Sequence, residues 1–246
     1  MLFRSKAPAD GHTLVMISAS FASSPSLYAK LPYDTLRDLA PVMLIAKSAS
    51  CLCIHPSLPT KGVKEFVALA KNKPGMINYG SPGVGTVGHF ATELFATQLG
   101  IKLNHVPYKG AALYTIDLIA GHIQLAIIQF AGCAPLLQQG RLRAIGATSE
   151  KRTPLLPELP TVAESGLQFN TSGWYGVLGP AVLPRALVDK LRAETLRAMA
   201  TPETKERLTA LAVETIGSTP EAFADLLKQE YAQWGRVVKA AGIKQQ

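Results

Sequence analysis

The stretch that decides the fold reads Asn78-Tyr79-Gly80-Ser81-Pro82-Gly83-Val84-Gly85-Thr86-Val87-Gly88-His89. It predicts the end of a strand, a glycine-rich bend and the first turn of a helix. Glycines let the backbone approach a bound group closely, and the first turn of a helix leaves N–H donors unpaired. Together with the positive end of the helix dipole, these donors predict a site for a small anion, either a carboxylate or a phosphate.

Polar side chains near the bend extend this candidate site. Ser81 and Thr86 place hydroxyl groups beside the glycines, and His89 in the first turn either hydrogen-bonds a ligand or caps the bend. A second loop, Tyr108-Lys109-Gly110, follows the next predicted strand and precedes another helix. Because the carboxyl ends of parallel strands meet at one edge of a sheet, we expect Lys109 to face the same anion.

The bend also has alternative interpretations. Gly83 to Gly88 fits G-x-G-x-x-G, but a dinucleotide site needs a long strand before the motif and a carboxylate after the next strand. Here Ser81-Pro82 intervenes and the next strand leads to Lys109. No catalytic set of Ser, His, Cys or paired carboxylates is indicated by position. We therefore predict binding without catalysis, with an anion- or nucleotide-binding α/β enzyme and a tight bend without ligand as alternatives.

Composition narrows the possible partners. The 246 residues are 48% hydrophobic and 17% charged, as expected of a globular protein, and no apolar run is long enough to span a membrane. The net charge of +8 comes from scattered Lys and Arg residues, which predicts attraction of anionic solutes. The scatter argues against a nucleic-acid partner. Cys51, Cys53 and His55 share one face of a predicted strand, but they lack further ligands. We predict no metal, no disulfide framework with Cys133, and buried thiols.

Strands and helices alternate outward from the bend. Predicted strands span 13–17, 42–54, 76–79, 103–106, 123–128, 142–148 and about 212–216. Predicted helices span 63–71, 87–99, 111–120, a short stretch ending at Gln138, 187–199, 202–211 and 220–240, with Thr60 and Thr219 as N-caps. Ser18 to Ser26 is predicted to be a ligand-facing loop, the segment 151–173 a crossing, and the chain after it mostly helical. The alternation predicts an α/β protein with a parallel sheet.

An ordered set of short motifs then resembles a known family. They are Asp10-Gly11-His12-Thr13-Leu14, Leu31-Pro32-Tyr33-Asp34, Asp38-Leu39-Ala40-Pro41-Val42, Ser81 to Thr86, His105 to Gly110, Gly140-Arg141-Leu142-Arg143-Ala144, Leu159 to Glu164, Trp174 and Pro180. From about Lys6 to Ile243 the chain resembles the tripartite tricarboxylate transporter substrate-binding proteins, often called Bug receptors.

The resemblance implies a two-lobed periplasmic binding protein of the type II-like class. Lobe 1 would comprise 1–40 and 173–246, and lobe 2 would comprise 41–172. Family members carry a signal peptide and roughly a quarter more chain ahead of Lys6, so we expect an N-terminal truncation, an incomplete first lobe with an exposed apolar edge beside 13–17, and weak solubility or binding. The implied role is periplasmic capture of a small carboxylate, by hinge closure, for delivery to membrane permease subunits, with no cofactor.

Many members have Asp-Asn where this chain has Ile128-Gln129, so Gln129 is expected to take over a polar contact. The complete set of predicted ligand-binding residues is Ser18, Ser20, Ser81, Gly83, Val84, Gly85, Thr86, His89, Tyr108, Lys109, Gly110 and Gln129.

Overall fold

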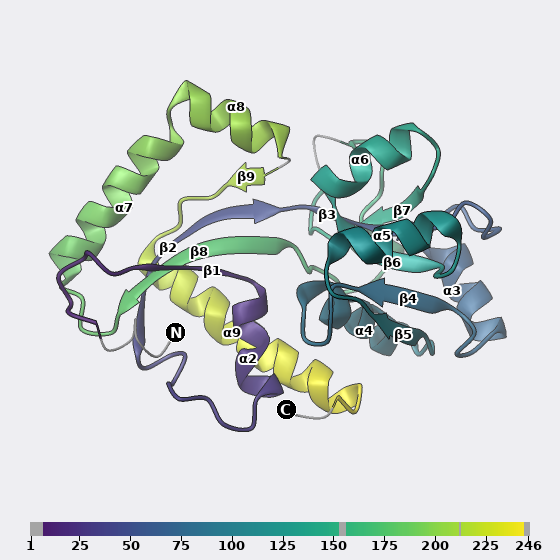
Figure 1. The fold of residues 1–246 in the computed structure, drawn as a ribbon, viewed down its shortest axis with the longest axis horizontal. Coiled ribbons are helices and arrows are strands. Elements are labelled where there is room, and N and C mark those ends of the chain that lie inside the picture. The colour runs from purple at the N-terminus through teal and green to yellow at the C-terminus, as the bar shows by residue number, and fades with distance from the viewer. Residues whose placement is uncertain (1–6, 153–155, 212, 244–246) are drawn as a thin grey trace. The chain divides into compact units, whose positions relative to one another are not determined.

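The computed structural model describes residues 7–152, 156–211 and 213–243, which form two compact units (Figure 1). Unit 1 comprises 1–47 and 174–246, and unit 2 comprises 48–173. Each unit has one sheet flanked by helices, as predicted for an α/β protein. Among the helices described, none is long and apolar enough to cross a membrane.

Unit 2 is built on a five-stranded mixed sheet with the order β5-β4-β6-β3-β7. The strands are β3 (Ser50–Ile54), β4 (Asn78–Ser81), β5 (Asn104–Pro107), β6 (Leu125–Gln129) and β7 (Arg143–Ala147). β4 runs parallel to β5 and β6, whereas β3 runs antiparallel to β6 and β7. The predicted all-parallel sheet is therefore wrong for the half that contains β3, because β3 enters from unit 1 rather than through a helical crossover.

Helices cover both faces of the unit 2 sheet. The helices are α3 (Val63–Asn72), α4 (Val87–Leu99), α5 (Ala111–Ala120), α6 (Phe130–Gln138) and the short η1 (Ala163–Ser165). On one face Phe66 of α3 and Phe95 of α4 pack against strand residues that include Tyr79. Burial of these large side chains supplies most of the driving force for folding the unit.

Cys51 and Cys53 are completely buried on β3, as predicted, and so is Cys133 on α6. All three thiols are free.

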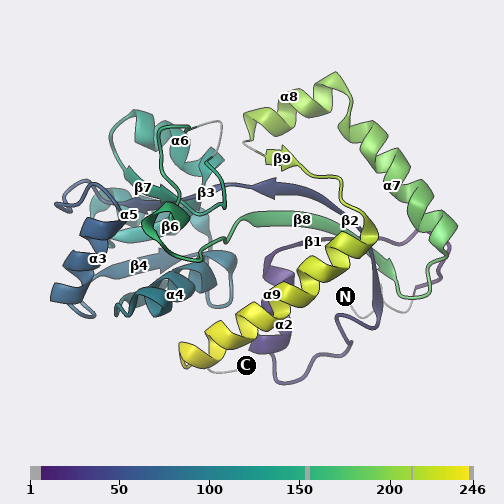
Figure 2. The ribbon, with the colours of Figure 1, turned by 180° about the vertical axis from the view of Figure 1, so that it is seen from behind.

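Unit 1 contains a four-stranded sheet with the order β1-β8-β2-β9. The strands are β1 (Val15–Ser18), β2 (Leu39–Ser48), β8 (Gly173–Pro180) and β9 (Val213–Thr215), and the helices are α2 (Ser20–Leu27), α7 (Arg185–Met199), α8 (Pro202–Ala210) and α9 (Pro220–Ala240). Figure 2 shows α9 beside the sheet and next to α2, with which it makes extensive contacts.

One close approach fixes α9 on this sheet. The Phe223 ring of α9 lies so near β8 that a Cβ added at Gly176 would come within 2.2 Å of the ring. Trp174 of the same strand meets the Phe223 ring edge to face, with 5.5 Å between centroids. A side chain at position 176 would therefore displace the helix, which explains glycine at this position.

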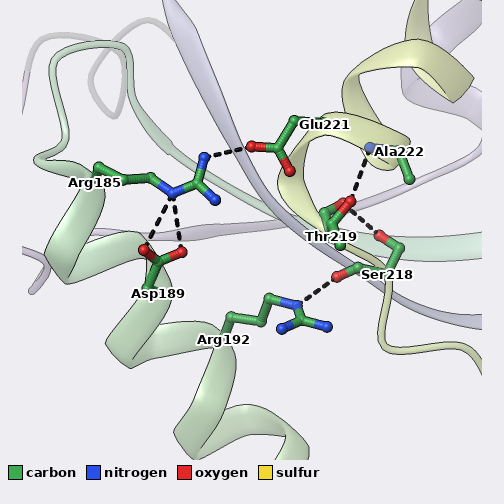
Figure 3. Close-up of polar contacts among 7 residues, drawn as sticks. All are labelled: Arg185, Asp189, Arg192, Ser218, Thr219, Glu221 and Ala222. Atoms are coloured by element: carbon green, nitrogen blue, oxygen red, sulfur yellow. Dashed lines mark hydrogen bonds and ion pairs between the residues drawn. The ribbon is translucent and has the colours of Figure 1, made fainter.

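Polar contacts join the start of α9 to α7 (Figure 3). Thr219 caps α9 as predicted, because its hydroxyl oxygen accepts from the Ala222 N–H at 3.2 Å. Arg185 forms an ion pair with Glu221 and another with Asp189, at 2.9 Å. Because these ion pairs are exposed, they help to orient the two helices but contribute little to the free energy of unfolding.

The sequence located most helices within two residues. The bounds of α5 and α9 coincide with the predicted 111–120 and 220–240, and β9 lies within the predicted strand at 212–216. Residue 212 and the part of the predicted crossing around Pro154 lie outside the described residues.

Several predictions near the N-terminus are wrong. The 13–17 segment is not buried on both faces in a parallel sheet. β1 pairs antiparallel with β8, and Met16 is 65% exposed between buried Val15 and Ile17. The predicted loop Ser18 to Ser26 is mostly the helix α2, because its buried face packs against α9.

Two other segments also differ from prediction. The single strand 42–54 is two strands in different sheets, β2 and β3, which separate at Ala49. The chain after the crossing is mostly helical, as predicted, but it begins with β8 at 173–180, which was not predicted.

Thr60 is not the N-cap of α3. Gly62 holds that position, and the Lys61 N–H is bound instead by the Glu65 carboxylate at 2.6 Å.

Glu230 of α9 gives unit 1 a pH-dependent stability. Its carboxylate accepts from the indole N–H groups of Trp174, at 2.8 Å, and Trp234, at 3.2 Å. Burial raises the pKa of Glu230 to about 7, although the two indole donors and the charge of Lys47 act in the opposite direction. Because the folded state holds this proton more tightly than the unfolded state, the free energy of unfolding decreases as pH rises from about 4.5 to 7.

We expect Glu230→Gln to raise the free energy of unfolding at pH 8 by roughly 1–3 kcal/mol and to leave it nearly unchanged at pH 4. The amide oxygen still accepts from an indole, without a buried charge. Urea denaturation at both pH values measures the difference, with the exposed Asp225→Asn as control. An equal effect of Glu230→Gln at both pH values would contradict the assigned cause.

Candidate functional site

The glycine-rich bend joins β4 to α4 through residues 82–86. Gly83 and Gly85 have φ values of 138° and 83°, which L side chains rarely adopt. Thr86 is the N-cap residue of α4, but its hydroxyl does not cap the helix and donates to the Gly83 carbonyl at 2.8 Å. The anion loop, defined here as residues 82–88, is thus folded back on itself by its own hydrogen bonds.

The anion loop presents backbone donors. Among the described residues, none accepts a hydrogen bond from the N–H groups of Val84, Val87 or Gly88. Two of these groups belong to the first turn of α4, where the helix dipole favours negative charge. This arrangement can hold a carboxylate or a phosphate without any charged side chain.

Ser81 supports the loop from beneath. The residue is completely buried; its hydroxyl donates to the Gly83 carbonyl at 3.1 Å and accepts from the Gly83 N–H at 3.2 Å. The Nε2 atom of His105 lies 2.7 Å from the same oxygen. Since the single hydroxyl proton goes to Gly83, we assign a proton to Nε2 of His105. Ser81 therefore shapes the loop, and its buried hydroxyl does not face solvent.

His89 resolves the alternative that the sequence left open. Its Nδ1 atom accepts from the Gly85 N–H at 3.1 Å, and the residue is 4% exposed. His89 thus caps the bend. Its ring stacks on His105 with 4.1 Å between centroids, and His105 stacks on Tyr79 at 4.8 Å. The Tyr79 hydroxyl donates to Glu93 of α4.

Burial determines the charge of these imidazoles. It lowers the pKa of both His89 and His105 to about 4, and the neighbouring His105 contributes to the shift at His89. Both rings are therefore neutral near pH 7. The anion loop rests on uncharged groups.

The second predicted loop lies directly beside the first. The Tyr108 N–H donates to the Ser81 carbonyl at 3.0 Å, and the Tyr108 hydroxyl donates to Asp117 at 2.6 Å. Lys109 is exposed, and Gly110 precedes α5 with a φ of 129°. The Tyr108 side chain is thus engaged by α5, while the Lys109 side chain is exposed to solvent.

The remaining predicted residues belong to other elements. Gln129 ends β6, next to β4 in the sheet, and is exposed. Ser18 and Ser20 belong to unit 1, where Ser18 is the exposed last residue of β1 and the Ser20 carbonyl accepts from Ser23 within α2. Hydrogen bonds are made among six predicted residues of this region, namely Ser81, Gly83, Gly85, Thr86, His89 and Tyr108, and Val84 lies between Gly83 and Gly85 in the same loop.

The sequence interpretation missed His105, Tyr79 and Glu93. A signal was present, because Tyr79 and His105 occupy the neighbouring predicted strands and their side chains can share one face. Glu93 follows His89 by four residues and therefore shares its helix face. Nothing in the described part of the chain groups three or more metal-ligating side chains.

A two-unit α/β fold with an anion loop at a helix N-terminus is typical of solute-binding receptors. Residues 2–243 match the model of the tripartite tricarboxylate transporter family receptor (TctC). The chain belongs to this family, whose members are solute receptors and not enzymes. The predicted family and fold class are therefore confirmed.

Solved structures agree with this assignment. Rpa4515 of R. palustris, solved with adipate, is 32% identical and superposes with a TM-score of 0.84, covering 100% of this chain and 83% of its own. MatC from Rhodopseudomonas palustris, with bound malate, is 27% identical with a TM-score of 0.81, covering 96% and 82%. The periplasmic binding protein BugD is 29% identical with a TM-score of 0.82, covering 100% and 83%.

We expect Ser81→Ala to lower the free energy of unfolding by about 1–3 kcal/mol, because it leaves the Gly83 N–H and Nε2 of His105 without their buried partner. Thermal or urea denaturation measures the loss. Ser149→Ala is the matched control, since its exposed hydroxyl donates only to a nearby carbonyl. A loss no greater than that of the control would contradict the supporting role of Ser81.

Proposed function

We propose that this protein is an extracytoplasmic receptor that binds a small carboxylate through the backbone N–H groups of the anion loop. The observation that carries the proposal is the set of unpartnered donors at Val84, Val87 and Gly88 among the described residues. The family membership and the adipate and malate held by two relatives favour a carboxylate over a phosphate.

The partners follow from the family. The receptor would deliver its ligand to the membrane permease subunits of a tripartite transporter, in the periplasm, where the relative BugD is a binding protein. Units 1 and 2 would be its two lobes. The chain passes between them at residues 47–48 and 173–174, and these two crossings are the natural hinge for closure on a ligand. Gln129, Lys109, Ser18 and Ser20 remain proposed contacts.

Calorimetry with adipate and malate tests the proposal. We expect saturable binding of at least one dicarboxylate, and the ligand should be recovered chemically unchanged after incubation. Phosphate serves as the competing anion. Absence of binding by every carboxylate tested, tighter binding of phosphate, or turnover of the ligand would overturn it.

Gly83→Ala should weaken carboxylate binding by a factor of roughly 5–30. Alanine is strained at a φ of 138°, although the added Cβ would make only an ordinary contact, 3.5 Å from the Tyr108 carbonyl. If the loop changes shape to relieve about 1–2 kcal/mol of this strain, that free energy must be supplied again to restore the binding shape. This corresponds to a factor of roughly 5–30 in affinity.

Gly166→Ala is the matched control. Its φ is 94° and open space surrounds the added Cβ, so it introduces similar backbone strain outside the loop. We expect this variant to lose stability but to keep its affinity, as measured by calorimetry well below its melting temperature. Equal losses of affinity in both variants would mean that the loop is not part of the ligand-binding site.

A further inference from the structure

We propose that His105 and His89 are positioning residues that hold the anion loop in its binding shape, His105 through Ser81 and His89 through Gly85. The role in binding rests on the proposed function. The effect on the loop stands independently, because it follows from contacts within unit 2.

The sheet register places His105 under the loop. β4 and β5 are parallel, and Tyr79 pairs with His105 while Ser81 pairs with Pro107. Tyr79, Ser81 and His105 therefore lie on the same face of the sheet, and α4 covers this face. Gly80 faces the other side, where a Cβ would meet Tyr114 of α5 at 2.9 Å.

Two residues of α4 face the strands from the helix side. His89 and Glu93 are one turn apart on α4, so both face the strands. His89 stacks on His105, and Glu93 accepts the Tyr79 hydroxyl hydrogen bond. The three rings Tyr79, His105 and His89 are called the column here; Tyr79 and His89 each stack on His105, and their own centroids are 6.4 Å apart.

Two hydrogen bonds connect this column to the loop. Nε2 of His105 meets the Ser81 oxygen that also binds the Gly83 N–H, and Nδ1 of His89 accepts from the Gly85 N–H. The column is thus linked to both glycines with positive φ, to Gly83 through Ser81 and to Gly85 directly. Val84 lies between these two glycines, so the direction of its N–H, from which no described residue accepts a hydrogen bond, depends on both contacts.

The contact with Gly85 requires a particular protonation state. Nδ1 of His89 accepts a hydrogen bond, so it carries no proton. Protonation would abolish this bond and place a cation 4.1 Å from the second imidazole. Among the described residues, the titratable groups in the column or in contact with it are Tyr79 on β4, Glu93 on α4 and the two imidazoles. The lowered pKa of each imidazole, about 4, keeps the column neutral above pH 5.

A purely structural role would have a different signature. Two hydrogen-bonded histidines that only fill space beneath the loop would affect the melting temperature without moving the glycine amides. The test therefore follows the Gly83 and Gly85 amide signals by NMR in the ligand-free protein, together with adipate affinity by calorimetry and the melting temperature.

Three variants separate the two roles. His105→Phe keeps the stacked ring but removes the donor to Ser81, His105→Gln keeps a donor without the ring, and His122→Phe alters an exposed histidine outside the column. We expect His105→Phe to shift the Gly83 amide signal and weaken adipate binding about five- to tenfold. His105→Gln should restore part of both, and His122→Phe should change neither.

In the wild-type protein the Gly85 amide signal should titrate with a midpoint near pH 4, and this transition should disappear in His89→Gln. The titration needs no ligand, so it decides the inference even if adipate does not bind or if His105→Phe fails to fold. An unshifted Gly83 amide in His105→Phe, or a Gly85 amide insensitive to pH between 6 and 3.5, would overturn the proposal. Failure of the wild-type protein to bind any carboxylate would instead overturn the proposed function.

Discussion

The arrangement of the site depends on the parallel pairing of β4 with β5, which sets Tyr79 opposite His105. A shift of one residue would turn His105 to the other face of the sheet and separate it from Ser81 and from α4. The same pairing brings the Tyr108 N–H to the Ser81 carbonyl and so aligns the two loops. Loop shape is therefore determined by the register of two four-residue strands and by the helix that covers them.

Local sequence signals were sufficient to predict helix bounds and the position of the glycine-rich loop. α9 has a threonine cap, a proline at its first position and an acidic first turn, and its predicted bounds are those observed. The anion loop was located by its glycines, and the two glycines at positive φ show why no other residue serves there. Each of these features depends on a few adjacent residues.

The predictions were wrong where tertiary contacts determine the bounds and the pairing of strands. Residues 42–54 read as one apolar strand, and only pairing with partners from two different sheets divides them at Ala49. β8 was missed because Gly176 and Pro180 weaken its strand signal, although the close approach of Phe223 requires the first of these. The link between His105 and Ser81 joins residues 24 apart in sequence and follows from the strand register, which the sequence does not state.

The proposed binding of an anion by backbone donors has a consequence for specificity. The N–H groups of the anion loop are held by neutral side chains, so they attract negative charge without an ion pair and without the desolvation cost of burying a second charge. Donors that the fold has already oriented also lose little entropy when a ligand arrives. Such donors would recognise the carboxylate group, which all candidate ligands share. Discrimination among carboxylates would then come from side chains outside the loop, and Gln129, exposed at the end of the neighbouring strand β6, is the residue that we propose for this role.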